Sequence, residues 1–160
     1  MSIRLFRVDE RLIHGQVVIG WGRRLHPRRF VVVDDVLATS EWEQELYRLA
    51  VDDEADVRFL DVDSACEVLP ALLADEVPTI LLTSDIDTMG RLAAGRVMEG
   101  ETVNIGGLHP APGRRSVRRW LNLGAEDEAG LRALSEAGVE VEGRALPDEP
   151  GVPLDAMLSS

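Results

Sequence analysis

Short apolar runs alternate along the chain with segments in which apolar residues recur at helical spacing. Short continuous apolar runs are typical of strands that are buried on both faces of a sheet. On this pattern we predict strands at residues 3–8, 30–33, 57–60, 79–83, 103–105, 117–123 and 139–146.

The segments between these runs predict helices. Val17, Val18, Trp21 and Leu25 lie on one helical face. Residues 64–74 predict another helix, a third runs from a cap at 84–85 to Gly95, and a last one is opened by acids at 126–128. One more helix is predicted directly after Ser40, because Ser40 and Glu43 have the spacing of a capping box. This helix carries an apolar stripe of Trp42, Leu46, Leu49 and Ala50.

The alternation of strands and helices predicts an α/β fold. Repeated β-α units imply one open, mainly parallel sheet of about six to seven strands with helices on both faces. The 160 residues suffice for a single domain, so we expect residues 1–160 to form it. Residues 147–160 carry three prolines and are expected to be a C-terminal tail.

Composition fits an ordinary globular protein, with 45% hydrophobic and 29% charged residues. No apolar run approaches a membrane span and no signal peptide opens the chain, which makes a cytoplasmic location the expectation. The single cysteine, Cys66, cannot form an internal disulfide, and its apolar helical surroundings favour a core position.

The net charge of −12 argues against a general nucleic-acid binder. The charge is uneven, because residues 1–29 hold seven arginines and two acids. This basic zone suits an anionic partner or a phosphate, and chance placement on a solvated face is the alternative. The arginines best placed to reach a partner are Arg7, Arg11, Arg23 and Arg24.

Four polar turns follow predicted strands, at residues 9–15, 34–35, 84–85 and 106–109. In open parallel sheets, ligands gather beyond the carboxyl ends of the strands. The candidate rim residues there are Asp34, Ser84, Gly106, Gly107 and His109.

The first of these turns holds the strongest candidate chemistry. The imidazole of His14 is a good nucleophile near pH 7 and can accept a phosphoryl group. Arg11 could bind phosphate oxygens as a fork, and Asp9 could fix the tautomer of the imidazole. The predicted phosphate-binding backbone groups belong to Gly15, Gln16 and Val17 at a helix start.

Plainer alternatives stay open for each part of this loop. Asp9 and Arg11 could simply pair with each other, and Gly15 could serve only a turn. His26 and His109 compete with His14 for a catalytic role. The chain has no P-loop and no GxGxxG, HExxH, CxxC or GxSxG pattern, so nucleotide binding, zinc hydrolysis and serine catalysis have little support.

The segment RVDERLIHGQVVIGW closely resembles the active-site signature of IIB components of the mannose/fructose/sorbose-type sugar phosphotransferase system (PTS). The resemblance continues, in order, over nearly the whole chain. It covers FVVVDDV, TILLTSDIDTMGRL, TVNIGGLH and GAEDEAGLRALSEAGVEVEGRALPDE.

This resemblance implies a protein-N(pi)-phosphohistidine–sugar phosphotransferase. His14 would take a phosphoryl group from a IIA partner and pass it to a sugar held by a IIC/IID permease at the inner face of the membrane. Arg11 matches the loop arginine that steadies the phosphoryl group, and Asp9 matches the acidic position. The resemblance implies no metal, cofactor or nucleic acid, and it leaves the sugar, the phosphorylated ring nitrogen and the oligomeric state open. A regulatory phosphorelay or a non-catalytic partner-binding protein remains the alternative.

Overall fold

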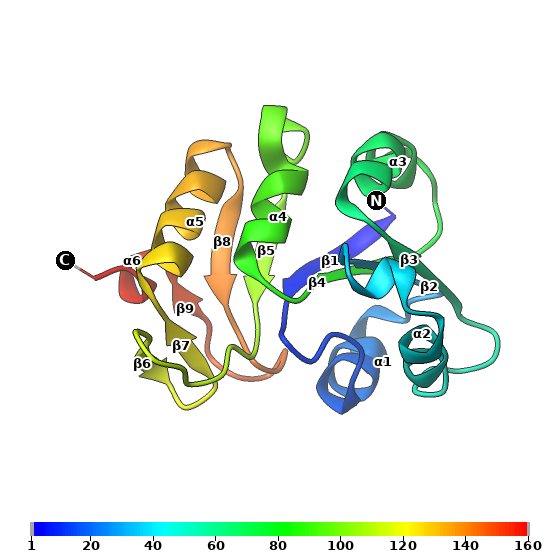
Figure 1. Cartoon of the computed structure of the whole chain (residues 1–160), viewed down its shortest axis with the longest axis horizontal. Helices are drawn as coiled ribbons and strands as arrows, with labels where there is room; N and C mark the ends of the chain where they lie inside the picture. The colour runs from blue at the N-terminus through cyan, green and yellow to red at the C-terminus, as the bar shows by residue number, and fades with distance from the viewer. Residues whose placement is uncertain (1, 160) are drawn as a thin grey trace.

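A seven-stranded sheet forms the centre of the protein (Figure 1). The structure is a computed structural model and describes residues 2–159. The strand order is β3-β2-β4-β1-β5-β8-β9; the first six strands are parallel, and β9 pairs antiparallel with β8. The strands are β1 (Ile3–Val8), β2 (Arg29–Val33), β3 (Asp56–Leu60), β4 (Thr79–Thr83), β5 (Thr102–Ile105), β8 (Glu140–Gly143) and β9 (Val152–Pro153).

Helices cover both faces of this sheet, as predicted (Figure 1). One face carries α3 (Val62–Ala74), α4 (Ile86–Ala93) and α5 (Ala125–Glu136), which bury the larger apolar core. The other face carries the π-helical turn η1 (Gln16–Trp21), α1 (Gly22–Leu25) and α2 (Glu41–Arg48) over a smaller core. The short elements are η2 (Leu37–Thr39), η3 (Ala94–Arg96) and α6 (Leu154–Met157). The α/β fold class is therefore confirmed.

The predicted tail is wrong, because residues 147–159 are built into the fold. Val152 of β9 and Met157 of α6 are buried, and the N–H of Ser159 donates to Oε1 of Glu128 at 2.6 Å. The three prolines do not prevent this packing, because Val152 and Met157 join the larger apolar core. As a result, β9 and not β8 forms this edge of the sheet.

Two smaller expectations also fail. The strand expected at 117–123 is a hairpin of β6 (Arg115–Arg118) and β7 (Leu121–Leu123). Cys66 is exposed, because it lies on the outer side of α3 while Leu69 and Leu72 face the sheet.

Within residues 2–159, no helix is both long and apolar enough to cross a membrane.

Candidate active site

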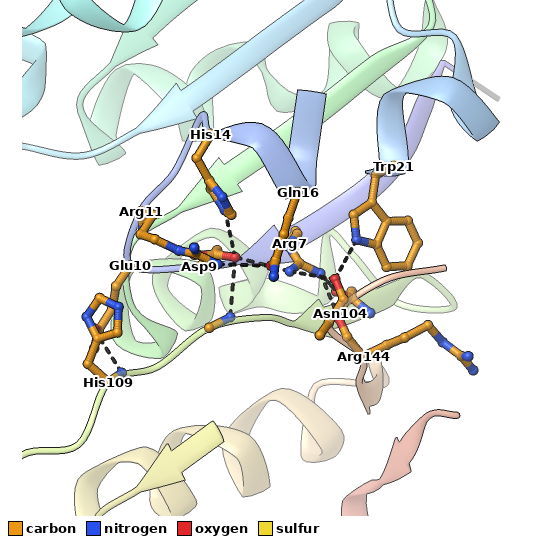
Figure 2. A network of polar contacts seen from close by, with 12 residues as sticks. Arg7, Asp9, Glu10, Arg11, His14, Gln16, Trp21, Asn104, His109 and Arg144 are labelled. Carbon is orange, nitrogen blue, oxygen red and sulfur yellow. Dashed lines mark hydrogen bonds and ion pairs between the residues drawn. The ribbon is translucent and has the colours of Figure 1, made fainter. Parts of the chain in front are cut away.

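The loop after β1 gathers around one buried carboxylate, that of Asp9 (Figure 2). Its Oδ1 accepts the backbone N–H of Arg11 at 3.0 Å. Its Oδ2 lies 3.1 Å from Nη2 of Arg7 and 3.1 Å from Nε2 of His14. The N–H of Gly107 donates to the same oxygen at 3.3 Å. Groups from β1, from its own loop and from the turn after β5 therefore converge on Asp9.

These contacts keep the carboxylate ionised. Burial by itself would raise the pKa of Asp9, because an ion loses hydration in the interior. The hydrogen bond from His14, the charge of Arg7 and the N–H of Arg11 oppose burial and prevail, lowering the pKa to about 2. Asp9 is thus a permanent anion beneath the imidazole at neutral pH.

Arg7 is the fully buried cation that meets this carboxylate. Nη1 donates to Oδ1 of Asn104 and, at 2.8 Å, to the carbonyl of Arg144; Nη2 donates to the carbonyl of Ala145 at 3.1 Å. The guanidinium carbon lies 5.4 Å from the ring centroid of Trp21, whose Nε1 also donates to the carbonyl of Ala145 at 3.0 Å. Burial lowers the pKa of Arg7, and its contact with the carboxylate opposes that effect.

The placement of Arg7 corrects its assignment to the partner-facing surface. A signal for the true position exists in the sequence. Arg7 lies in β1 and Asp9 directly follows the strand, so the two side chains are two extended residues apart and point to the same side. The strand β1 is central and parallel, which buries both of its faces. A charge at such a position requires a partner, and Asp9 is the nearest candidate.

His14 is held with one ring nitrogen engaged. Its side chain is 15% exposed, and Nε2 contacts Oδ2 of Asp9. Since an ionised carboxylate oxygen only accepts hydrogen bonds, this contact requires a proton on Nε2, and in the neutral imidazole the lone pair then lies on Nδ1. No protein group within residues 2–159 hydrogen-bonds Nδ1. The preceding Leu12 is buried with φ of 55°, and its side chain and that of Ile13 anchor the loop in the smaller core.

Arg11 lies at the mouth of the site with 42% of its side chain exposed. Its Nη2 donates to Oε1 of Gln16 at 2.9 Å, and its Nε is 3.7 Å from Oδ1 of Asp9. The two residues therefore do pair, as the plainer alternative had it. The pairing nevertheless leaves much of the guanidinium facing solvent near His14.

The backbone groups at the helix start match the prediction only in part. The N–H groups of Gly15 and Gln16 donate to no acceptor within the described residues. The N–H of Val17 is already used, because it donates to the carbonyl of His14 at 3.0 Å. The prediction that the N–H of Val17 binds phosphate is therefore wrong, because this N–H is already hydrogen-bonded in the first turn of the helix. Gly15 has helical φ of −51° and open space where a Cβ would lie.

The rim residues do not all belong to the site. Ser84 donates to Oδ2 of Asp34 at 3.1 Å, and Oδ1 of Asp34 caps η2 by accepting the N–H groups of Val36 and Leu37. Asp34 and Ser84 thus join neighbouring loops without touching His14. They border the site and take no part in its hydrogen bonds.

In the turn after β5, the glycines lie against Arg7 and Asp9, whereas the histidine points away from the site. Gly107 binds Asp9 through its N–H, and a Cβ at Gly106 would overlap the guanidinium of Arg7. His109 is 61% exposed and pairs through Nδ1 with Glu10 at 2.7 Å, away from His14 (Figure 2). The other candidate, His26, ends α1 in a left-handed conformation and is exposed. Neither histidine contacts the Asp9 carboxylate.

Comparison with known proteins gives one consistent result. A family model described as "PTS system sorbose subfamily IIB component" matches residues 3–160. The sorbose-specific EIIB component of Klebsiella pneumoniae is 29% identical over 95% of this chain and 92% of its own. The mannose-specific EIIAB component of Escherichia coli K12 is 28% identical over 99% of this chain and 49% of its own. The crystal structure of manxB from Thermoanaerobacter tengcongensis superposes with a TM-score of 0.85 at 30% identity, covering 96% of this chain and 93% of that one.

The family match spans almost the whole chain, and the fold of a solved relative agrees with it throughout. A histidine on a loop at the carboxyl edge of the sheet is compatible with a carrier of phosphoryl groups. The chain therefore belongs to the sorbose subfamily of PTS IIB components and is a phosphocarrier of that system.

Proposed function

We propose that His14 carries the phosphoryl group on Nδ1, with a IIA component as donor and a sugar in a IIC/IID permease as final acceptor. The observation that carries this proposal is the contact between Nε2 of His14 and Asp9. It holds the proton on Nε2 and leaves Nδ1, the N(pi) atom, as the nucleophile. The activity is then that of a protein-N(pi)-phosphohistidine–sugar phosphotransferase.

In the loading step, the Nδ1 lone pair forms a bond to phosphorus. The bond from phosphorus to the donor imidazole breaks, and its electron pair returns to the donor ring. His14 keeps the proton on Nε2, so its ring becomes cationic, and the adjacent Asp9 anion stabilises it. In the unloading step, a sugar hydroxyl oxygen attacks phosphorus, the pair returns to Nδ1, and the hydroxyl proton passes to solvent or to a base of the acceptor.

Three further groups support these steps. Arg11 holds phosphoryl oxygens with its exposed guanidinium, aided by the unused N–H groups of Gly15 and Gln16. Arg7 is a positioning residue, because it fixes the Asp9 carboxylate beneath the ring and never reaches solvent. Asp9 in turn sets the tautomer and orientation of His14.

The family supports the proposed partners. The name of the mannose-specific EIIAB component joins A and B components in one protein, and this chain covers 49% of it. A IIA component is accordingly the proposed donor. Delivery to a permease places this chain in the cytoplasm, at the inner face of the membrane.

The test is transfer of radiolabelled phosphate from a phosphorylated IIA component. Wild type should take up acid-labile, base-stable label, and His14→Ala should take up none while keeping its fold. His109→Ala is the matched control and should label normally. Full labelling of His14→Ala would remove His14 as acceptor. NMR of the ¹⁵N-labelled phosphoprotein then distinguishes Nδ1 from Nε2, and phosphate on Nε2 would contradict the role given to Asp9.

A further inference from the structure

Helix α2 turns an apolar stripe toward solvent. Trp42, Leu46 and Leu49 share one face of the helix and are 69%, 58% and 81% exposed. Val36, in the loop before η2, is 74% exposed. We call Trp42, Leu46 and Leu49 the α2 stripe. Such a stripe normally faces the core of a surface helix, so its outward direction needs an explanation.

The stripe is free because a few other side chains hold α2 to the sheet. Tyr47 packs against Phe59 of β3 with ring centroids 6.2 Å apart. Arg48 lies over the same ring at 4.9 Å and donates to the carbonyl of Val57 at 3.2 Å. No residue of α2 is buried. Clustered apolar side chains that a monomer leaves in water mark surfaces that bind a partner.

The charge around the stripe limits what that partner can be. Residues 34–54 hold eight acids and one arginine. Exposed acids on and after α2 border the stripe; they are Glu41, Glu45, Asp52, Asp53 and Glu54. A complementary surface is therefore apolar at its centre and basic at its rim. A bare membrane does not fit, because its inner leaflet is anionic.

The loop before α2 is connected to the active loop through the end of β4. Ser84 donates a hydrogen bond to Asp34 of that loop, and the N–H of Asp9 donates to the carbonyl of Thr83 at 2.9 Å. Leu37 shares an apolar cluster with Leu12, which lies two residues before His14 in the active loop. Figure 1 shows α2 beside α1 on the same side of the sheet. These contacts connect the loop before the stripe-bearing helix to the loop that holds His14.

We infer that the α2 stripe docks the cytosolic face of the sugar permease. This inference rests on the proposed function, which requires a second partner after the IIA donor. Cytosolic loops of membrane proteins carry an excess of Lys and Arg, which matches the acidic border of the stripe. The phosphorylated donor is instead anionic and matches the exposed arginines of the His14 loop and α1. The two partners would thus recognise different surfaces of opposite charge.

The test compares both transfers in one variant, Leu46→Arg/Leu49→Arg. These side chains are exposed, so the fold should persist, which thermal unfolding will check. The matched control is Val97→Arg, at an exposed apolar position after α4. Loading is measured as transfer from phosphorylated IIA. Unloading is measured as sugar phosphorylation by the phosphorylated protein in inverted vesicles with or without the permease.

The double variant should load at the wild-type rate, within about twofold, and unload at least roughly tenfold more slowly at limiting protein concentration. The control should change neither step. Equal unloading by wild type and double variant would overturn the inference, as would slower loading, which would assign the stripe to IIA. Sedimentation that shows a wild-type dimer split by the double variant would assign it to a second copy instead. If wild type itself fails to load on His14, it is the proposed function that fails.

Discussion

Asp9 keeps a negative charge at a position where burial opposes one. Its pKa of about 2 lies below the ordinary 3.8, so the folded protein releases this proton more readily than the unfolded chain does. The resulting stabilisation is complete above about pH 4 and is lost as pH falls toward 2, and it amounts to about 2 kcal/mol.

We therefore expect the free energy of unfolding of Asp9→Asn to fall less than that of wild type as the pH is lowered. Urea unfolding at pH 5 and pH 2.5 should show that wild type loses about 1.5 kcal/mol more than the variant across this interval. The pKa values of Asp75 and Glu128 are also lowered by their hydrogen bonds, but both proteins share them, so the difference isolates Asp9. Equal losses in the two proteins would contradict the assigned pKa.

The rate of loading should depend on the shape of the side chain at position 11 as well as on its charge. We expect both Arg11→Ala and Arg11→Lys to slow loading, because an ammonium cannot hold two phosphoryl oxygens as a planar fork does. Loss of one charge-assisted contact costs roughly 1.5–3 kcal/mol, or about tenfold to a hundredfold in rate. Quench-flow transfer from phosphorylated IIA measures this effect, with Arg132→Lys on an exposed face of α5 as control. A wild-type rate in Arg11→Lys would reduce Arg11 to a surface charge.

At the scale of elements, Arg7 ties three strands together beneath the site. It belongs to β1, and its guanidinium bonds Asn104 of β5 and the carbonyls that follow β8. Gly106, just after β5, leaves the space that the guanidinium occupies. We expect Gly106→Ala to destabilise the fold by about 1–3 kcal/mol, because the buried Arg7 cannot move aside without losing its partners.

Gly90→Ala is the matched control for that substitution. Gly90 lies inside α4, and a Cβ there would meet no atom within 4 Å. Alanine should therefore stabilise the helix by roughly 0.5–1 kcal/mol. Thermal or urea unfolding of both variants tests the pair, and equal stability changes would mean that Arg7 does not fill the space at Gly106.

The same scale shows what the sequence could predict. The buried strands were predictable, because a parallel sheet covered on both faces requires continuous apolar runs. The position of His14 followed from the strand end that precedes it. The outward direction of the α2 stripe could not be predicted. Periodicity identifies the residues that share a helix face, but it does not show whether that face contacts the core or solvent. The sequence likewise could not show that Val152 and Met157 return to the core, because this depends on contacts with distant elements.

For the whole molecule, the uneven charge should govern the encounter with the donor. The basic zone is weaker than its sequence suggests, because Arg7 and Arg29 are buried against Asp9 and Asp75. Arg24 pairs with Asp148. Arg11 and Arg23 remain exposed on the side that a phosphorylated partner approaches, and Arg23 forms no ion pair within residues 2–159.

Complementary charge raises association rates more than affinity, and exposed charges are screened beyond about 8 Å at physiological ionic strength. The second-order rate of loading from phosphorylated IIA should therefore fall as salt rises. Arg23→Glu should lower that rate at low salt and reduce its salt dependence, whereas Arg132→Glu, on α5 across the sheet, should change neither as much. Stopped-flow loading rates at low and high salt measure both effects. A flat salt dependence in wild type would show that collision with the donor is not steered by charge, and loading would then depend on the geometry around His14 alone.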